Sequence, residues 1–196
     1  MRKFWILISL FCTMALTNQT FAISISLLPS SQTIALGDTA TVDLAISGLG
    51  SDGPVSLGAF ALDFTYDDTV LEFSSVDFGL YLGDPSFFEA DTYYDDVTSG
   101  VLYLDEVSWL SDLELDILQP GSFTLATIMF TVIDLGSSLL ELENVDLSDA
   151  LGFGLDPSIK NASVNPVPEP ATILLLVSGM AGLGVFGRKR FRSPKA

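Results

Sequence analysis

The sequence predicts an all-β protein whose folded part is one small sandwich. Three observations predict it. Apolar and polar residues alternate along most of residues 23–164, clusters of glycine, proline and aspartate interrupt this alternation at short intervals, and no long stretch has the period of a helix. Alternation with period two places every second side chain on the same face of a strand. The combination is typical of a β-sandwich or a jelly roll.

The strands are expected in this order along the chain. Alternation is clearest in residues 40–46 and in residues 60–66, where apolar side chains occupy every second position. Shorter stretches with a similar composition complete a set of eight or nine strands: 24–28, 33–36, 70–75, 101–107, 123–133, 139–145 and 159–164. Turn signals lie between them, among them Gly37-Asp38, Gly83-Asp84-Pro85 and Pro120-Gly121.

The N-terminal end has the features of a secretory signal peptide. Arg2 and Lys3 give it a positive start, residues 4–16 are apolar, and Thr20-Phe21-Ala22 has the small residues of a cleavage site. The apolar stretch is shorter than the roughly 20 residues of a membrane-spanning helix. We therefore expect residues 1–22 to be removed after Ala22.

The C-terminal end has the features of a membrane anchor. A proline-rich spacer over residues 165–170 precedes residues 171–187, which carry no charge. A basic segment, residues 188–196, follows. Its stop signal consists of Arg188, Lys189, Arg190 and Arg192. The positive-inside rule predicts one transmembrane helix over 171–187, a cytoplasmic tail, and a domain of residues 23–164 on the outer side.

Composition excludes several classes of chemistry. The chain has no histidine, and its single cysteine, Cys12, lies in the predicted signal peptide, so catalytic triads and histidine or cysteine metal sites are excluded. We expect no cofactor and no enzymatic activity. Between residues 23 and 167 there are 24 acidic residues and one basic residue, Lys160. Such a surface repels nucleic acid, so no nucleic-acid partner is expected.

The tail resembles a known sorting signal. Val167, Pro168, Glu169 and Pro170, the uncharged stretch and the Arg-Lys-Arg end occur in the order found in PEP-CTERM proteins of exopolysaccharide-producing Gram-negative bacteria. The resemblance implies processing by an exosortase, a membrane enzyme that cuts near the Pro-Glu-Pro motif. An ordinary single-pass anchor with a proline-rich spacer has the same spanning features.

The folded region resembles a cohesin module. The Tyr66-Asp67-x-x-x-Leu71-x-Phe73 step is the most distinctive feature, and residues 125–130 and 142–149 add to it. This resemblance implies a nine-stranded jelly-roll sandwich related to cellulose-binding modules. The chain has no dockerin-type calcium repeat, and a cohesin-like sheet in a PEP-CTERM protein need not bind a dockerin.

Two groups of acidic residues are candidates for chemical sites. Asp63, Asp67 and Asp68 crowd near one strand end and are calcium candidates, although their spacing matches no calcium loop and turn chemistry explains Asp67 and Asp68 more simply. Asp105 and Glu106 are a candidate carboxylate pair for glycoside hydrolysis. Adjacent strand residues point to opposite faces, which disfavours that role.

Residues 84–116 mix ten acidic residues with aromatic ones. The candidate ligand-binding aromatics are Tyr93, Tyr94, Tyr103 and Trp109. Such rings either stack on a sugar or pin a long loop to the sandwich, and we expect the pinning role here. We also expect a bulge near Asp105-Glu106 that turns Trp109 into the core.

Two functions from different classes remain. The first is a non-enzymatic exported surface or matrix protein, whose sandwich mediates contacts with another envelope protein. The second is a carbohydrate-binding module acting on exopolysaccharide. Exposed planar aromatics favour the second function, and a flat sheet without an aromatic row favours the first.

Overall fold

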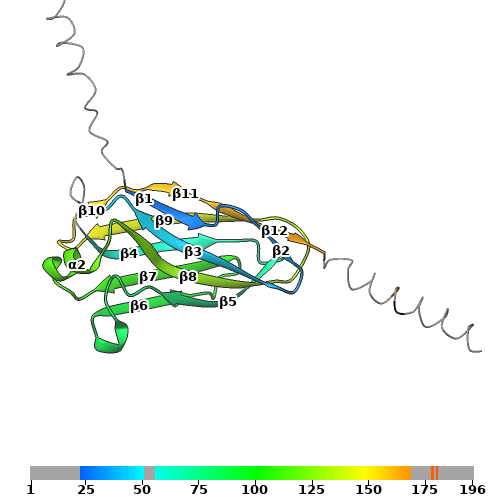
Figure 1. Cartoon of the computed structure of the whole chain (residues 1–196), viewed down its shortest axis with the longest axis horizontal. Coiled ribbons are helices and arrows are strands. Elements are labelled where there is room, and N and C mark those ends of the chain that lie inside the picture. The colour runs from blue at the N-terminus through cyan, green and yellow to red at the C-terminus, as the bar shows by residue number, and fades with distance from the viewer. Residues whose placement is uncertain (1–22, 51–55, 169–177, 179, 181–196) are drawn as a thin grey trace, which may run out of the picture.

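The computed structural model describes residues 23–50, 56–168, 178 and 180. Its strands form two sheets that lie face to face (Figure 1). The first sheet has the strand order β11-β1-β3-β8-β5, and the second has the order β2-β12-β9-β4-β7-β6, with β10 paired to β9. The strands are β1 (Ser24–Leu28), β2 (Gln32–Ala35), β3 (Thr39–Ser47), β4 (Leu57–Thr65), β5 (Leu71–Phe78), β6 (Ala90–Asp95), β7 (Val101–Ser108), β8 (Ser122–Val132), β9 (Ser138–Asp149), β10 (Gly154–Leu155), β11 (Ser158–Lys160) and β12 (Ala162–Val167).

The core lies between the two sheets and follows the alternation of the sequence. Every second residue of β3 and β4 is buried, including Val42 and Leu44 on β3 and Phe60 and Phe64 on β4. The rings of Phe64 and Phe130 stack across the interior with centroids 5.6 Å apart. Because the two rings come from different sheets, they contribute to the packing that holds the sheets together.

The described residues form twelve strands, so the predicted number of nine is too low. The prediction treated residues 159–164 as one strand, but the chain crosses between the sheets there, with β11 in the first sheet and β12 in the second. β1 and β2 also lie in different sheets, but they were predicted as two separate strands. The two-residue strand β10 was not predicted. β6 was missed because its exposed acidic and aromatic residues give no clear apolar alternation.

The folded domain extends three residues beyond its predicted boundary at residue 164. β12 pairs in parallel with β2, and this pairing places Asn165 opposite Thr33 and Val167 opposite Ala35. The predicted spacer 165–170 therefore begins inside a strand. The prolines misled the prediction, because proline is tolerated on a strand that has a free edge or an interrupted ladder.

A short helix, α2 (Asp112–Leu118), was not predicted. The carboxylate of Glu114 accepts hydrogen bonds from the backbone N–H and the hydroxyl of Ser111, at 2.8 and 2.6 Å. At the other end, the amide of Gln119 bonds both the N–H and the C=O of Leu57, at 2.7 and 2.8 Å. A Ser-x-x-Glu sequence is a known helix-start signal, so the sequence contained a sign of this helix.

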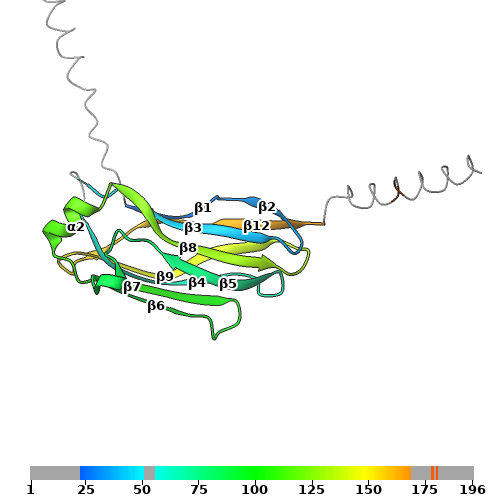
Figure 2. The same cartoon turned by 60° about the horizontal axis from the view of Figure 1, so that its bottom comes forward.

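β5 and β6 are edge strands of different sheets, and they lie along the same side of the sandwich (Figure 2). A 3-10 turn, η1 (Pro85–Phe87), precedes β6. The rings of Phe73 on β5 and Tyr94 on β6 have centroids 5.8 Å apart. The sandwich is therefore bridged by aromatic packing at a side where no strand pairing joins the sheets.

The predicted terminal segments lie almost wholly outside the described residues. This holds for residues 1–22 and, apart from Ser178 and Met180, for the predicted span 171–187 and the basic tail. Within the part of the chain that the structure describes, no helix is both long enough and apolar enough to cross a membrane.

Candidate binding face on the second sheet

The outward surface of β9, β4, β7 and β6 is the candidate functional site, and we call it the acidic face. Antiparallel pairing aligns the outward residues of these strands in rows. One row runs from Asp146 through Ala61 and Asp105 to Tyr93. A neighbouring row contains Glu143, Asp63, Tyr103 and Asp95.

Three of the predicted aromatic residues lie on this face. Tyr93 on β6 and Tyr103 on β7 have ring centroids 6.1 Å apart. Trp109 follows β7, and its backbone N–H donates to the backbone carbonyl of Glu89 at 2.7 Å. This bond continues the pairing between β6 and β7 by one more residue. Trp109 thus shares the outward parity of Tyr103 and is 65% exposed.

The prediction that Trp109 is buried is wrong. The pairing of β7 with β4 and with β6 shows no register shift, so the expected bulge near Asp105-Glu106 is absent from β7. Leu102, Leu104 and Glu106 therefore share the inward face. The polar character of Glu106 misled the prediction, because a buried carboxyl was not expected at a core position.

The expectation that the aromatics pin a loop is also wrong for most of them. Phe87, Phe88 and Tyr93 are all more than half exposed, at 73%, 87% and 56%. Tyr94 differs, because it lies on the opposite face of β6 from Tyr93 and packs on Phe73, although it remains 48% exposed. The four candidate aromatics therefore do not form one site: Tyr93, Tyr103 and Trp109 share the acidic face, and Tyr94 lies outside it.

Carboxylates dominate the acidic face. Its seven acidic residues are Asp63, Asp91, Asp95, Asp105, Glu141, Glu143 and Asp146. Lys160, the only basic residue in residues 23–168, lies on β11 in the other sheet. The hydroxyl of Tyr103 donates to Asp105 at 3.1 Å. Partial burial, followed by the hydrogen bond and charge of Asp105, raises the pKa of Tyr103, so the phenol stays a neutral donor.

The three calcium candidates are engaged separately. Asp63 accepts from the Asn144 side chain at 2.6 Å, Asp67 accepts from the N–H and hydroxyl of Thr69 at 3.0 and 2.6 Å, and Asp68 accepts from the Ser99 hydroxyl. The two bonds from Thr69 lower the pKa of Asp67. No group of three metal-binding side chains was found within the described residues. The turn interpretation of Asp67 is confirmed.

Asp105 and Glu106 do point to opposite faces, as expected. Asp105 lies on the acidic face, whereas Glu106 is fully buried and pairs in register with Phe60 and Thr92. Within the described structure, neither carboxylate oxygen of Glu106 has a hydrogen-bond partner. Burial, and then the charge of Asp105, raises the pKa of Glu106 to about 8. The two carboxyls do not face one substrate, so they do not form a glycosidase pair.

Sequence reasoning missed the contribution of β9 to this face. Glu141, Glu143 and Asp146 lie far along the chain from the aromatic residues, and only the pairing of β9 with β4 brings them together. The positive φ of Asn144, 48°, marks a shift in that pairing and places the Asn144 amide beside Asp63. A run of acids on one strand was visible in the sequence, but its partner strand was not.

The fold and the sheet surface define a β-sandwich module made of two sheets. Residues 26–154 match the cohesin domain, and residues 166–190 match the PEP-CTERM protein-sorting motif. The chain therefore belongs to the cohesin domain family. Both resemblances seen in the sequence are confirmed. No curated protein matches the chain.

Solved structures of cohesins have the same fold. A cohesin in a type I cohesin–dockerin complex from Clostridium thermocellum is 14% identical, with a TM-score of 0.61 over 74% of this chain and 99% of that chain. A type II cohesin from the cellulosome of Acetivibrio cellulolyticus is 19% identical, with a TM-score of 0.60 over 74% and 95% of the two chains. A non-cellulosomal cohesin from the archaeon Archaeoglobus fulgidus is 17% identical, with a TM-score of 0.58 over 77% and 95%.

Only part of the sorting motif lies within the described residues. Val167 ends β12, and Pro168 follows it directly. Glu169, Pro170 and the basic residues Arg188, Lys189, Arg190 and Arg192 lie outside the described residues. The motif therefore begins where the folded domain ends.

Proposed function

We propose that this protein is a non-enzymatic surface or matrix protein whose sandwich binds another protein through the acidic face. One observation carries the proposal: seven carboxylates share this face with the exposed rings of Tyr93 and Trp109, and no basic residue lies among the described residues of the face. Such a surface is complementary to a basic protein surface. Charge complementarity of this kind selects partners and speeds their association.

The aromatic residues favour a protein partner. Tyrosine and tryptophan are enriched among the residues that dominate binding energy at protein interfaces. Tyr93 and Tyr103 lie on the neighbouring strands β6 and β7 of the acidic face, and each has an aspartate next to it in its row. The C. thermocellum relative was solved in a cohesin–dockerin complex, in which the same fold contacts a second protein module. Here we propose the class of contact, a protein with a basic surface, and not a particular partner.

The sorting motif supports a location of this binding domain outside the cell. The PEP-CTERM match at residues 166–190 supports export through the inner membrane, transient anchoring by the predicted helix 171–187, and cleavage near Pro168-Glu169-Pro170 by an exosortase. Because β12 ends at Val167, a cut in this motif would leave the folded domain intact. Release and transfer to another molecule both agree with this arrangement.

Site-specific photo-crosslinking in the native host tests the binding face. A photoreactive amino acid replaces Tyr93 on the acidic face or, as a control, Thr41 on the outward surface of the first sheet. We expect a discrete protein adduct from position 93 and none from position 41. The adduct should weaken when Asp105→Asn and Glu143→Gln remove two charges from the face. Equal adducts from both positions would contradict the proposal.

Binding of exopolysaccharide is the second candidate function, and the exposure of Tyr93 and Trp109 favours it. Once residues 1–22 are removed, Trp109 is the only tryptophan in the chain, so its fluorescence reports directly on this face. Saturable quenching by purified exopolysaccharide, together with loss of that quenching in Tyr93→Ala, would replace the protein-binding proposal with this one. We expect no saturable change.

A further inference from the structure

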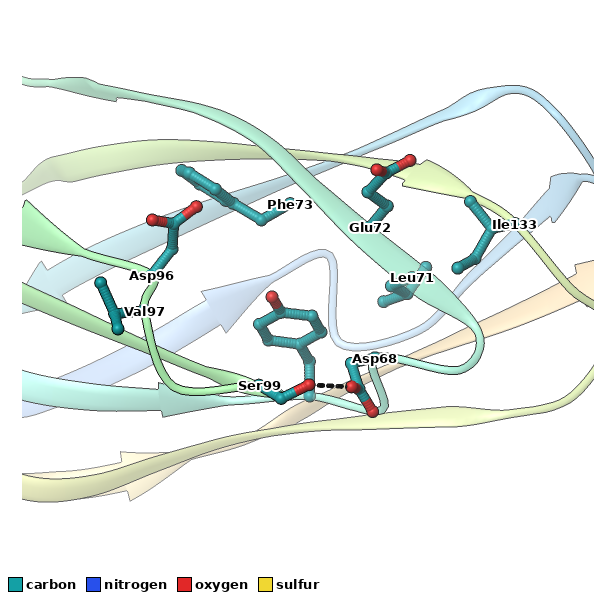
Figure 3. Close-up of a pocket in the computed structure, with 10 residues that line it drawn as sticks. Asp68, Leu71, Glu72, Phe73, Asp96, Val97, Ser99 and Ile133 are labelled. Carbon is teal, nitrogen blue, oxygen red and sulfur yellow. Dashed lines mark hydrogen bonds between the residues drawn. The ribbon is translucent and has the colours of Figure 1, made fainter.

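A pocket separate from the acidic face lies on the side of the sandwich where β5 and β6 face each other. It encloses about 410 Å³ and is lined by residues from the β4–β5 turn, β5, the β6–β7 turn and the residue after β8. Figure 3 shows Asp96 and Val97 across the opening from Leu71, Glu72 and Ile133. The pocket shares no lining residue with the acidic face, so each is tested by its own variants.

The inner part of the pocket is aromatic. Tyr66 packs on Phe130 of the core with ring centroids 4.9 Å apart, and Phe73 packs on Phe130 at 6.2 Å and on Tyr94 at 5.8 Å. These contacts hold Tyr66 and Phe73 in place between the two sheets. Rings fixed in this way give the pocket a preformed apolar wall, to which Leu71, Val97 and Ile133 add aliphatic surface.

The turn that closes the pocket is also fixed. The N–H of Tyr66 donates to the carbonyl of Gly100 at 2.9 Å, and the Ser99 hydroxyl donates to Asp68. Gly100 has a φ of +73°, and a Cβ atom there would lie 2.8 Å from the carbonyl oxygen of Tyr66. Only glycine meets both conditions without strain. The β6–β7 turn therefore lies at a set distance from β5.

The charged part of the pocket is entirely negative. Asp68, Glu72 and Asp96 line it, and no basic side chain does. Burial, followed by the charges of Asp96 and Asp68, raises the pKa of Tyr66, which shows that both carboxylates act on this space. The carboxylates do not converge as metal ligands do, because no metal-binding group of three was found among the described residues. The pocket is therefore suited to a larger cation than a metal ion.

We infer that this pocket binds an arginine side chain presented by a partner protein. An arginine has an apolar stem, which matches Leu71 and Ile133, and a flat cationic end, which stacks on aromatic rings and bonds carboxylates in pairs. The volume is near the lower end of the range for ligand pockets and admits one side chain rather than a folded module. A second copy of the folded domain is not the source, because residues 23–168 contain no arginine.

Peptide titration of the full-length chain tests this inference. The ¹⁵N-labelled chain in detergent micelles is titrated with acetyl-Gly-Arg-Gly-amide, and the amide signals of Ser99 and Gly100 are followed by NMR. We expect saturable shifts with a millimolar dissociation constant, and no saturable shifts with the glutamine analogue. An equal response to the lysine analogue, or displacement of the peptide by calcium, would overturn the assignment to arginine.

Two double variants make the test specific to the pocket. Glu72→Gln with Asp96→Asn removes two pocket charges whose carboxylates accept no hydrogen bond from the described residues, so folding should be retained. Asp77→Asn with Asp116→Asn removes two exposed charges elsewhere. We expect at least a fivefold weaker affinity in the first variant and no change in the second. Equal weakening in both would mean that the peptide responds to net charge alone, and the pocket would not be a site.

Discussion

Phe73 on β5 and Tyr94 on β6 join the two sheets at the side where no strand pairing connects them, with ring centroids 5.8 Å apart. Phe73 also belongs to the aromatic packing around Phe130, because the two rings lie 6.2 Å apart in an edge-to-face arrangement. The Phe73–Tyr94 contact closes one side of the core, and Phe73 also lines the pocket that we assign to an arginine.

The Phe73–Tyr94 contact should have a measurable coupling energy. We expect Phe73→Leu and Tyr94→Leu to be non-additive in a double-mutant cycle, with a coupling of about 0.5–1.5 kcal/mol in the free energy of unfolding. Urea denaturation measures it. The pair Phe73→Leu and Tyr93→Leu is the control, because Tyr93 packs on Tyr103 and lies on the other face of β6. Additivity in both cycles would show that the ring contact does not stabilise the sandwich.

Exposure of Trp109 predicts that its removal changes stability little. Trp109→Ala should alter the free energy of unfolding by about 0.5 kcal/mol or less, because no core contact is lost. Leu115→Ala on α2 should cost about 2–5 kcal/mol, since Leu115 is fully buried. Leu113→Ala on the same helix is the matched control, because Leu113 is 68% exposed. A blue-shifted emission of Trp109 in the processed chain would contradict this prediction.

Glu106 should make stability fall as the pH rises. Below pH 4.5, the ordinary pKa of a glutamate carboxyl, Glu106 is protonated in both the folded and the unfolded chain. Between pH 4.5 and about 8, the unfolded chain releases this proton while the folded chain retains it. The folded state therefore loses relative stability across this window, by about 1.4 kcal/mol for each unit of pKa difference at most.

Glu106→Met tests this effect. The variant should be more stable than the parent by roughly 1–4 kcal/mol at pH 8, with a much smaller difference at pH 4, where the buried carboxyl is neutral in both states. Thermal unfolding across this pH range measures the difference. Glu143→Met is the control, because Glu143 is exposed on β9. A gain that is independent of pH would show that Glu106 titrates normally in the folded chain.

The excess of carboxylates predicts stabilisation by salt. Residues 23–168 carry one basic residue, so added sodium chloride should raise the melting temperature by screening repulsion between acids. Calcium should act no more strongly than sodium chloride at the same ionic strength, because Asp63, Asp67 and Asp68 bond separate protein groups. A much larger rise with calcium would reveal a specific ion site.

Processing of the tail predicts a defined mass. In a host with an exosortase, the mature protein should lack residues 1–22 and the basic residues Arg188–Arg192, with its new C-terminus near Pro168-Glu169-Pro170. Intact-mass spectrometry measures both ends. A host without the exosortase is the control, and there the tail should remain. Retention of the basic residues in both hosts would favour the ordinary anchor.

Local patterns in the sequence are enough to establish the composition of the strands and their approximate positions. The alternation of apolar and polar residues located most of them, because successive side chains of a half-buried strand point in turn to the core and to the solvent. The absence of histidine and the position of Cys12 limited the chemistry, and the Pro-Glu-Pro motif with its flanking segments identified the sorting signal. These features are local, so they can be interpreted without knowing which strands are neighbours.

Strand pairing in the folded domain, and not the local sequence, sets which face of β7 is buried and what surrounds it. Both parities of β7 carry apolar residues, so the sequence allowed Trp109 to point either way. Pairing with β4 and β6 without a register shift directed Trp109 outward and Glu106 into the core. The pairing of β9 with β4 placed the acids of β9 on the same face as Tyr93 and Tyr103. Contacts between distant segments determine these outcomes, and local alternation does not encode which strands will pair.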